Sequence, residues 1–202
     1  MMFQHFELAQ LPVSPWRNGG GATREVARHP QAAGADGFEW RVSVADIGAD
    51  GPFSAYPGID RSITLLEGDG VRMRSADGAL DHLLDAALRP FAFAGEHAID
   101  ATLLGGPSRD FNVMTQRGRW RADTRALHGQ AVLAPAQAGV LYAARGDWRV
   151  RCDAGQALLR AGTGVVWRAA AGAIHATPLG GEGGLIAVRL LEVGALAVAR
   201  GA

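Results

Sequence analysis

Short runs of alternating apolar and polar residues dominate the chain. In the clearest run, FEWRVSVADI at residues 38–47, Trp40 and Val42 fall on one face of an extended chain and Arg41 and Ser43 on the other. A period of two residues predicts strands, and 28 glycines and 9 prolines divide the sequence into pieces of strand length. We predict an all-β sandwich or barrel, with an interior that holds something polar.

One segment has an ambiguous pattern. The apolar spacing of LDHLLDAALR, residues 80–89, suits a helix and suits a strand hairpin equally well. Helix is a minor component of the fold in either case.

The sequence also contains an internal repeat. RSITLLEGDGVRMR at residues 61–74 is answered by GVLYAARGDWRVRC at residues 139–152, and each copy has a Gly-Asp step between two strand-like runs. We therefore expect two tandem copies of one β-unit. Each copy is too small to bury a full hydrophobic core alone, so the two are expected to share a single core. We place them at residues 1–115 and 116–202, with residues 1–35 as an extra segment packed on the pair.

Charge and composition narrow the class of partner. The 20 acidic residues balance 20 basic ones with no basic block, which argues against a nucleic-acid footprint or an anionic membrane surface. Every basic residue is arginine, so lysine Schiff bases and P-loop lysines are excluded and arginine is the anion-binding side chain. We expect a small ligand or a protein partner.

Cysteine usage and hydropathy predict the compartment. The single Cys152 cannot form an intrachain disulfide, and the first residues show neither a basic nor an apolar signal region. No apolar stretch reaches the roughly 18 to 20 residues of a membrane helix. We expect a cytoplasmic protein with no membrane partner.

Metal and nucleophile motifs are missing from the sequence. Its six histidines are scattered and form no HxH, HxxxH or CxxC pattern, so we predict neither a metal nor another cofactor. Cys152 lies in strand-like WRVRC without a visible activating partner, and no GxSxG occurs. The glycine run in SPWRNGGGATREV matches no nucleotide motif; it is a plain turn closed by Asn18 or a turn lining a ligand pocket, with Thr23 and Glu25 on one strand face.

Four ordered motifs resemble those of the HutD/Ves family: WRNGGGATREV, FEWRVSVADIGADGPFSAYPGIDRSITLLEG, LRPFAFAG and DFNVMTQR. The resemblance covers about the first 115 residues, and the second half follows the same layout. It implies a bicupin, two tandem jelly-roll β-barrels in one chain. It also implies a modulator of histidine utilisation that senses urocanate or N-formylglutamate, or a Ves-like stress-related protein. Neither branch has a firmly assigned catalytic activity.

The cupin pattern gives Arg61 a special position. Metal-binding cupins carry two histidines and then a glutamate ahead of a closing glycine; if Gly68 is that glycine, Arg61 stands at the glutamate and residues 54–57 supply no histidine. A buried guanidinium requires a carboxylate partner. That partner is either internal, from Asp60, Glu25 or Asp110, or it belongs to a bound ligand held in bidentate fashion.

Several residues around Arg61 are candidates for the same ligand. Asn112, flanked by Phe111 and Val113, is expected to be buried and to bond either a neighbouring loop or the ligand. The ligand-binding candidates are Arg61, Tyr56, Asn112, Ser43, Arg41, Glu25 and Trp40, with Trp16 and Phe53 completing an aromatic wall.

Three functional classes stay open at this point. The first is a metal-free protein that senses a small carboxylate. The second is a metal-independent cupin enzyme, of isomerase or lyase type, with Glu25 or His97 as general base. The third is a structural or interaction protein with a vestigial pocket. A homodimer also remains open, because cupin sheets often pair edge to edge.

Overall fold

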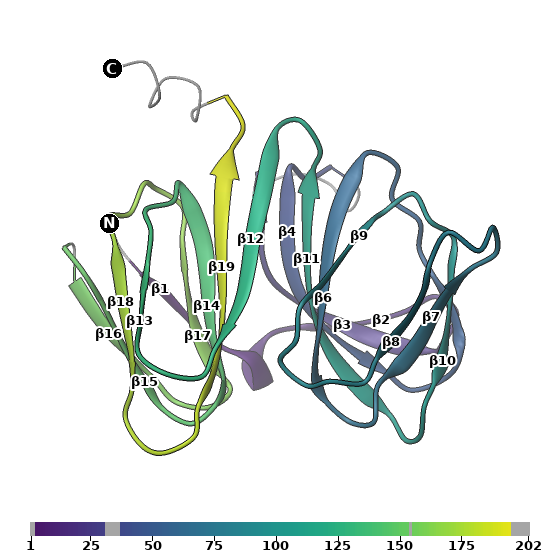
Figure 1. The fold of residues 1–202 in the computed structure, drawn as a ribbon, viewed down its shortest axis with the longest axis horizontal. Helices are drawn as coiled ribbons and strands as arrows, with labels where there is room; N and C mark the ends of the chain where they lie inside the picture. The colour runs from purple at the N-terminus through teal and green to yellow at the C-terminus, as the bar shows by residue number, and fades with distance from the viewer. Residues whose placement is uncertain (1–2, 31–36, 154, 195–202) are drawn as a thin grey trace. The chain divides into compact units, whose positions relative to one another are not determined.

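The computed structural model describes residues 3–30, 37–153 and 155–194. These residues form 19 strands and a single 3-10 helix, η1 (Leu8–Gln10), so the all-β prediction is confirmed (Figure 1). The ambiguous segment at residues 80–89 begins with strand β8 (Asp81–Leu84) and continues as a turn. Along β8, Leu84 is buried while Leu83 is exposed, which is the alternation of a strand rather than of a helix.

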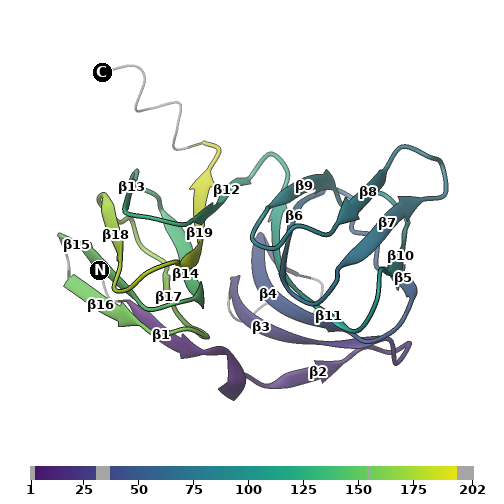
Figure 2. The same ribbon diagram turned by 60° about the horizontal axis from the view of Figure 1, so that its bottom comes forward.

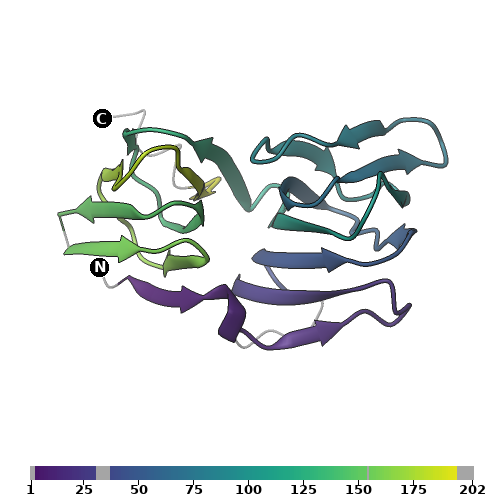
Figure 3. The same cartoon turned by 90° about the horizontal axis from the view of Figure 1, so that it is seen from below.

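The chain separates into two compact units. The N-terminal unit is Pro12–Arg117; the C-terminal unit is Gly118–Ala202 together with Met1–Leu11. The first strand, β1 (Gln4–Glu7), pairs with β17 (Thr163–Trp167) of the C-terminal unit, and Figure 3 shows it in purple beside the green strands. The described part of residues 1–35 therefore contributes strands to both units and is not one added segment.

Two antiparallel sheets build the N-terminal unit (Figures 1 and 2). The six-stranded sheet has the order β2 (Val13–Pro15), β3 (Gly21–His29), β4 (Trp40–Ile47), β11 (Ser108–Gln116), β6 (Ile59–Glu67) and β9 (Phe91–Ala94). The four-stranded sheet has the order β5 (Gly51–Phe53), β10 (Ile99–Leu103), β7 (Val71–Ser75) and β8. Ile63 and Leu65 of the larger sheet pack with Val71 and Met73 of the smaller one, so the core of this unit lies between its sheets.

The C-terminal unit repeats the plan with a more uniformly apolar core. Its five-stranded sheet has the order β1, β17, β14 (Ala138–Arg145), β19 (Gly184–Glu192) and β12 (Trp120–Leu127). Its four-stranded sheet has the order β13 (Ala131–Leu133), β18 (Ile174–Pro178), β15 (Trp148–Cys152) and β16 (Gly155–Leu159). Trp148, Trp167 and Cys152 lie in one cluster drawn from both sheets, so the cysteine packs as a core residue.

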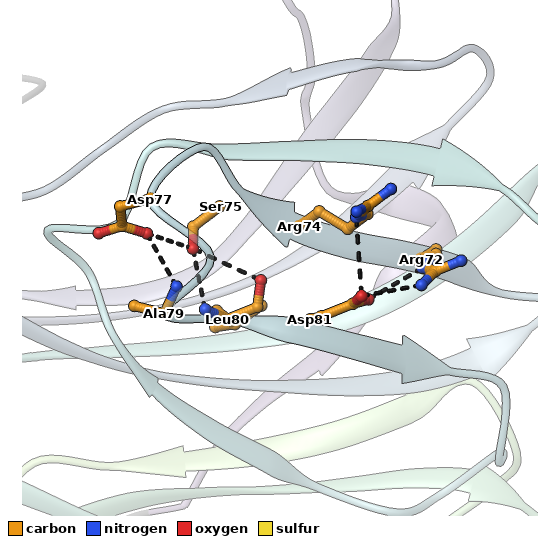
Figure 4. Close-up of polar contacts among 7 residues, drawn as sticks. All are labelled: Arg72, Arg74, Ser75, Asp77, Ala79, Leu80 and Asp81. Carbon is orange, nitrogen blue, oxygen red and sulfur yellow. Dashed lines mark hydrogen bonds and ion pairs between the residues drawn. The ribbon is translucent and has the colours of Figure 1, made fainter.

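The β7–β8 hairpin shows how the exposed face of the smaller sheet is held (Figure 4). Arg72 donates to both carboxylate oxygens of Asp81 at 2.9 and 2.8 Å, and Arg74 lies 3.6 Å from the same carboxylate. At the turn, the Ser75 hydroxyl donates to Asp77 at 2.6 Å. The charged residues of this hairpin therefore pair on its outer face, away from the core.

The described sheets remain open. In the described ranges, none of the four sheets pairs its first strand with its last, so the predicted closed barrels are not seen; each unit is a pair of sheets around a core. Within the same ranges, no helix has the length and apolar character needed to cross a membrane.

Candidate functional site

Arg61 lies on the inner face of the six-stranded sheet. On β6 it shares a face with Ile63 and Leu65, whose side chains pack in the core of the N-terminal unit. The ladder places it opposite Met114 on β11 and opposite Phe93 on β9. Only 7% of Arg61 is exposed, so the charge at the start of β6 is buried.

The guanidinium of Arg61 is only partly satisfied. Nη2 donates to Oδ1 of Asn112 at 3.0 Å, and Nη1 donates to the backbone carbonyl of Ser54 at 3.3 Å. Nε is buried with no hydrogen-bond partner in the part of the chain that the structure describes. The ring of Phe93 lies 4.9 Å from the Arg61 Cζ atom and that of Tyr56 5.7 Å, at cation–π distance.

No carboxylate among the described residues forms an ion pair with Arg61. Asp60 pairs with a different arginine, because its Oδ1 lies 2.7 Å from Nη2 of Arg117. Glu25 accepts from Arg41 at 2.9 Å and also pairs with Arg28. The direct internal salt bridge left open by the sequence is therefore not formed by these carboxylates.

Asp110 is connected to Arg61 through one amide. Nδ2 of Asn112 donates to Oδ1 of Asp110, while Oδ1 of the same amide accepts from Arg61. We call Arg61, Asn112 and Asp110 the Arg61 cluster. Asn112 is 6% exposed and Asp110 1%, so three polar side chains from two neighbouring strands meet inside the sandwich.

Burial shifts both charged members of the Arg61 cluster. Removal from water lowers the pKa of Arg61 to about 10, although the negative charge of Asp110 acts in the opposite direction. Burial also raises the pKa of Asp110 to about 7, against the lowering effects of Arg61 and Asn112. The cluster thus combines a fixed cation with a carboxyl group that changes charge near neutral pH.

Ser43, Arg41 and Glu25 extend this polar region across the sheet. Ser43 of β4 lies opposite Asn112 on one side and opposite Glu25 of β3 on the other. Burial acts to raise the pKa of Glu25, but Arg28 and Arg41 lower it overall. Glu25 is therefore held as a carboxylate by two arginines, which makes it a weak general base and commits Arg41 to a structural pair.

The aromatic candidates separate into two groups. Trp16 and Phe53 meet edge to face with ring centroids 6.2 Å apart and pack against the core between the two sheets. Trp40 lies elsewhere: strand alternation places it on the face of β4 opposite to Ser43, and its ring stacks on His29 at 6.0 Å. The structure therefore does not bring Trp40 to Arg61, whereas Tyr56 is brought there.

Two further expectations concern His97 and metals. The pKa of Asp77, in the β7–β8 turn, is lowered mainly by the Ser75 hydroxyl and to a smaller extent by His97. In the part of the chain that the structure describes, no hydrogen bond or ion pair links His97 to the Arg61 cluster. Within the described ranges, no group of three or more His, Cys, Asp or Glu side chains is arranged to hold a metal ion.

The sequence missed two contributors to the site. Phe93 covers Arg61 because β9 pairs with β6, and the backbone carbonyl of Ser54 reaches it from the turn before β6. The alternation in the run around Phe93 marks a strand, but it does not reveal which strand lies beside it.

Comparison with known proteins identifies the family. The HutD family model matches residues 8–186. Protein Ves from Citrobacter koseri is 38% identical over 165 residues, which cover 81% of this chain and 82% of Ves. HutD from Pseudomonas fluorescens SBW25 has a similar structure, with a TM-score of 0.80 and 29% identity over 95% of this chain and 99% of that one.

A more distant comparison bears on the fold alone. A cupin 2 conserved barrel domain protein from Leptotrichia buccalis gives a TM-score of 0.57 at 10% identity, covering 94% of this chain and 96% of that one. The resemblance predicted from the four motifs is confirmed by the family model and by the Ves and HutD relatives. The chain belongs to the HutD family and has a cupin-like fold.

Proposed function

We propose that this chain is a metal-free, small-molecule-binding protein that senses a carboxylate through Arg61. The observation that carries the proposal is the state of that guanidinium: it is 7% exposed and has no ion pair among the described residues. A buried cation without a counter-ion is costly, and a ligand carboxylate would supply the missing charge. Two of its five N–H donors are used by Asn112 and Ser54, which leaves Nε–H and others for a bidentate contact.

Neighbouring side chains suit the planar carboxylate group of a small anion. Tyr56 and Phe93 lie over the Arg61 guanidinium, and the hydroxyl of Ser43 and the amide of Asn112 offer further hydrogen bonds. As members of the same family include HutD, we propose urocanate or N-formylglutamate as the ligand and modulation of histidine utilisation in the cytoplasm as the role. The two-barrel bicupin arrangement, with the ligand in the N-terminal unit, is part of this proposal.

A metal-independent enzyme is the second candidate, and Asp110 favours it. A carboxyl group with a pKa of about 7 next to a bound anion has the properties of a general acid or base. Incubation with each candidate carboxylate and analysis for a new product distinguishes an enzyme from a sensor.

Isothermal titration calorimetry tests the binding proposal. Purified protein is titrated with urocanate, N-formylglutamate and formate, and the same titrations are repeated with Arg61→Ala and Arg61→Lys. We expect binding to the native protein, none to Arg61→Ala, and at least about tenfold weaker binding to Arg61→Lys, which keeps the charge but loses the planar fork.

Arg117→Ala is the matched control for this experiment. Arg117 is an exposed arginine of the same unit, paired with Asp60 and Glu96, and its removal is expected to leave ligand affinity unchanged. Full binding by Arg61→Ala, with native circular dichroism, overturns the arginine clamp. Absence of binding to the native protein supports a vestigial pocket instead.

A further inference from the structure

Asp110 is a buried carboxyl group that the carboxylate clamp itself does not explain. It is 1% exposed, and among the described residues its hydrogen-bond donor is the neutral amide of Asn112. A buried carboxylate ordinarily needs several donors or a paired cation. Arg61 is the cation whose charge acts on Asp110, and the hydrogen bonds reach it through that amide and not directly.

Because the amide of Asn112 joins Asp110 to Arg61, an ionised Asp110 and a bound anion are two negative charges that compete for the one positive charge of Arg61. With Asp110 ionised, the Arg61 cluster contains one positive and one negative charge; with Asp110 neutral, its net charge is positive and suits an anion. We propose that Asp110 couples carboxylate binding at Arg61 to the uptake of one proton. This inference rests on the proposed function, because it requires a carboxylate ligand at Arg61.

The coupling has a defined balance and sign. Arg61 lowers the pKa of Asp110, so an anion that neutralises Arg61 raises that pKa. The ionised protein, one ligand carboxylate and one proton from the buffer give a complex with neutral Asp110, and the O–H bond of Asp110 is the only new covalent bond. Below about pH 7 Asp110 is already protonated and the affinity is constant; above it, affinity falls by up to about tenfold per pH unit.

The other charged groups around Asp110 are already paired or lie farther out. Asp46 of β4 acts to raise the pKa of Asp110, but it is engaged by Arg24 of β3 and Arg109 of β11. On β3, Glu25 is held ionised by its arginines. Asp110 is therefore the carboxyl group of the sheet interior whose charge is expected to change near neutral pH.

The facing four-stranded sheet offers one competing titratable group. Its inward residues include Val71 and Met73, while its charged residues, Arg72, Arg74, Asp81 and Asp100, are exposed (Figure 4 shows the first three). His82 of β8 is half-buried and stacks on Phe91 at 3.5 Å, and burial lowers its pKa from the ordinary value. A control for His82 is therefore necessary.

Formate is the appropriate probe, because carboxyl groups of its kind are ionised throughout the range from about pH 6 to 9. Its binding to the native protein is measured by calorimetry at several pH values in two buffers of different ionisation enthalpy, which gives the protons taken up per formate. We expect uptake near zero at about pH 6, rising toward one proton at about pH 8. Affinity is expected to weaken over the same interval.

Asp110→Asn mimics the neutral form permanently. This variant is expected to bind formate with an affinity independent of pH, to take up no proton, and to bind about tenfold more tightly than the native protein at about pH 8.5. His82→Gln is expected to keep the native pH dependence. If the asparagine variant does not fold, proton uptake by the native protein decides the question.

The outcomes separate this inference from the proposed function. Binding of formate by the native protein without proton uptake at about pH 8, or a pH dependence that persists in Asp110→Asn, overturns the coupling and leaves the arginine clamp intact. Absence of formate binding at every pH overturns both.

Discussion

At one corresponding sheet position, the N-terminal unit has a charged side chain and the C-terminal unit has none. Seven residues before the Gly-Asp step, the N-terminal unit has Arg61 and the C-terminal unit has Gly139. A Cβ atom at Gly139 would lie 2.2 Å from the backbone oxygen of Val188 and 2.4 Å from the ring of Trp167. The indole and the neighbouring strand therefore occupy space in the C-terminal unit where the N-terminal unit holds a guanidinium.

The partner strands extend the contrast. By ladder register, Asn112 and Asp110 of β11 correspond to Ala187 and Leu185 of β19. Both C-terminal residues are in the apolar cluster, 1% and 0% exposed. Two related sandwiches thus use one strand layout with a polar cluster between the sheets of one unit and apolar residues at the corresponding positions of the other, so this layout does not require buried charges.

Placing the arginine of the N-terminal unit at the corresponding glycine of the C-terminal unit is expected to have the largest effect on stability. Gly139→Arg places a charged side chain against the backbone of Val188 and the ring of Trp167, where there is no space for it, and is expected to cost more than about 4 kcal/mol of unfolding free energy. Gly129→Arg is the control, because a Cβ at Gly129 meets nothing within 4 Å. Urea denaturation compares the two, and equal stability would contradict the packing difference described here.

Asp110 gives the next largest effect, on the pH dependence of stability. Its pKa is about 7 in the folded protein, against an ordinary value of 3.8. Between these values the folded state holds the proton more tightly than the unfolded state, so stability falls as pH rises from about 4 to about 7 and is level above. The loss is on the order of 4 kcal/mol. Urea denaturation of the native protein and Asp110→Asn at successive pH values measures it.

Other titrating groups also change stability with pH, but they do so equally in the native protein and in Asp110→Asn, so the difference between the two profiles reports on Asp110. Carboxyl groups with lowered pKa values, such as Asp46 and Glu25, stabilise the fold above their ordinary values and lose that contribution at lower pH. The lowered pKa of His82 makes stability rise up to its ordinary value of 6.5. Asp60→Asn, at an exposed carboxylate, is expected to keep the native profile, whereas Asp110→Asn loses the decline. Parallel profiles for all three proteins would refute the assignment.

Asn112 tests the link between the two charges, with a smaller expected effect. Asn112→Ala leaves Nη2 of Arg61 and Oδ1 of Asp110 without their shared partner, at an expected cost of about 1–3 kcal/mol. The reciprocal change, Ala187→Asn, buries an amide in the apolar cluster of the C-terminal unit and is expected to cost a similar amount. Chemical denaturation measures both. A neutral Asn112→Ala would mean that the amide contributes little to the cluster.

Local patterns in the sequence predict strands and the faces of those strands, so strand positions and buried faces were predictable. The alternation at residues 38–47 predicts β4. The cupin resemblance, counted back from Gly68, implies a buried position for Arg61, which is 7% exposed. The same alternation places Trp40 on the face away from Ser43, so the pleat of β4 separates it from the other Arg61 candidates.

Long-range pairing accounts for what was not foreseen. Strand β1 pairs with β17 across most of the chain length, and Phe93 reaches Arg61 because β9 is the neighbour of β6. Hydrophobic period specifies which side of a strand is buried but not which strand lies beside it. The pKa of Asp110 likewise depends on burial and on one amide, which are properties of the assembled sheet.

The exposed hairpins give the smallest expected difference between the units. Across β7–β8, Arg74 faces Asp81, which also binds Arg72; across β15–β16, the corresponding Arg151 faces the uncharged Gln156. Asp81→Asn is expected to lower the thermal midpoint slightly at low salt and not at high salt, because exposed ion pairs are weak and screened. Gln156→Glu is expected to raise it slightly under the same low-salt conditions. An Asp81→Asn effect as large as that of Asn112→Ala, or one that persists at high salt, would mean that the hairpin pair stabilises the N-terminal unit more than its exposure allows.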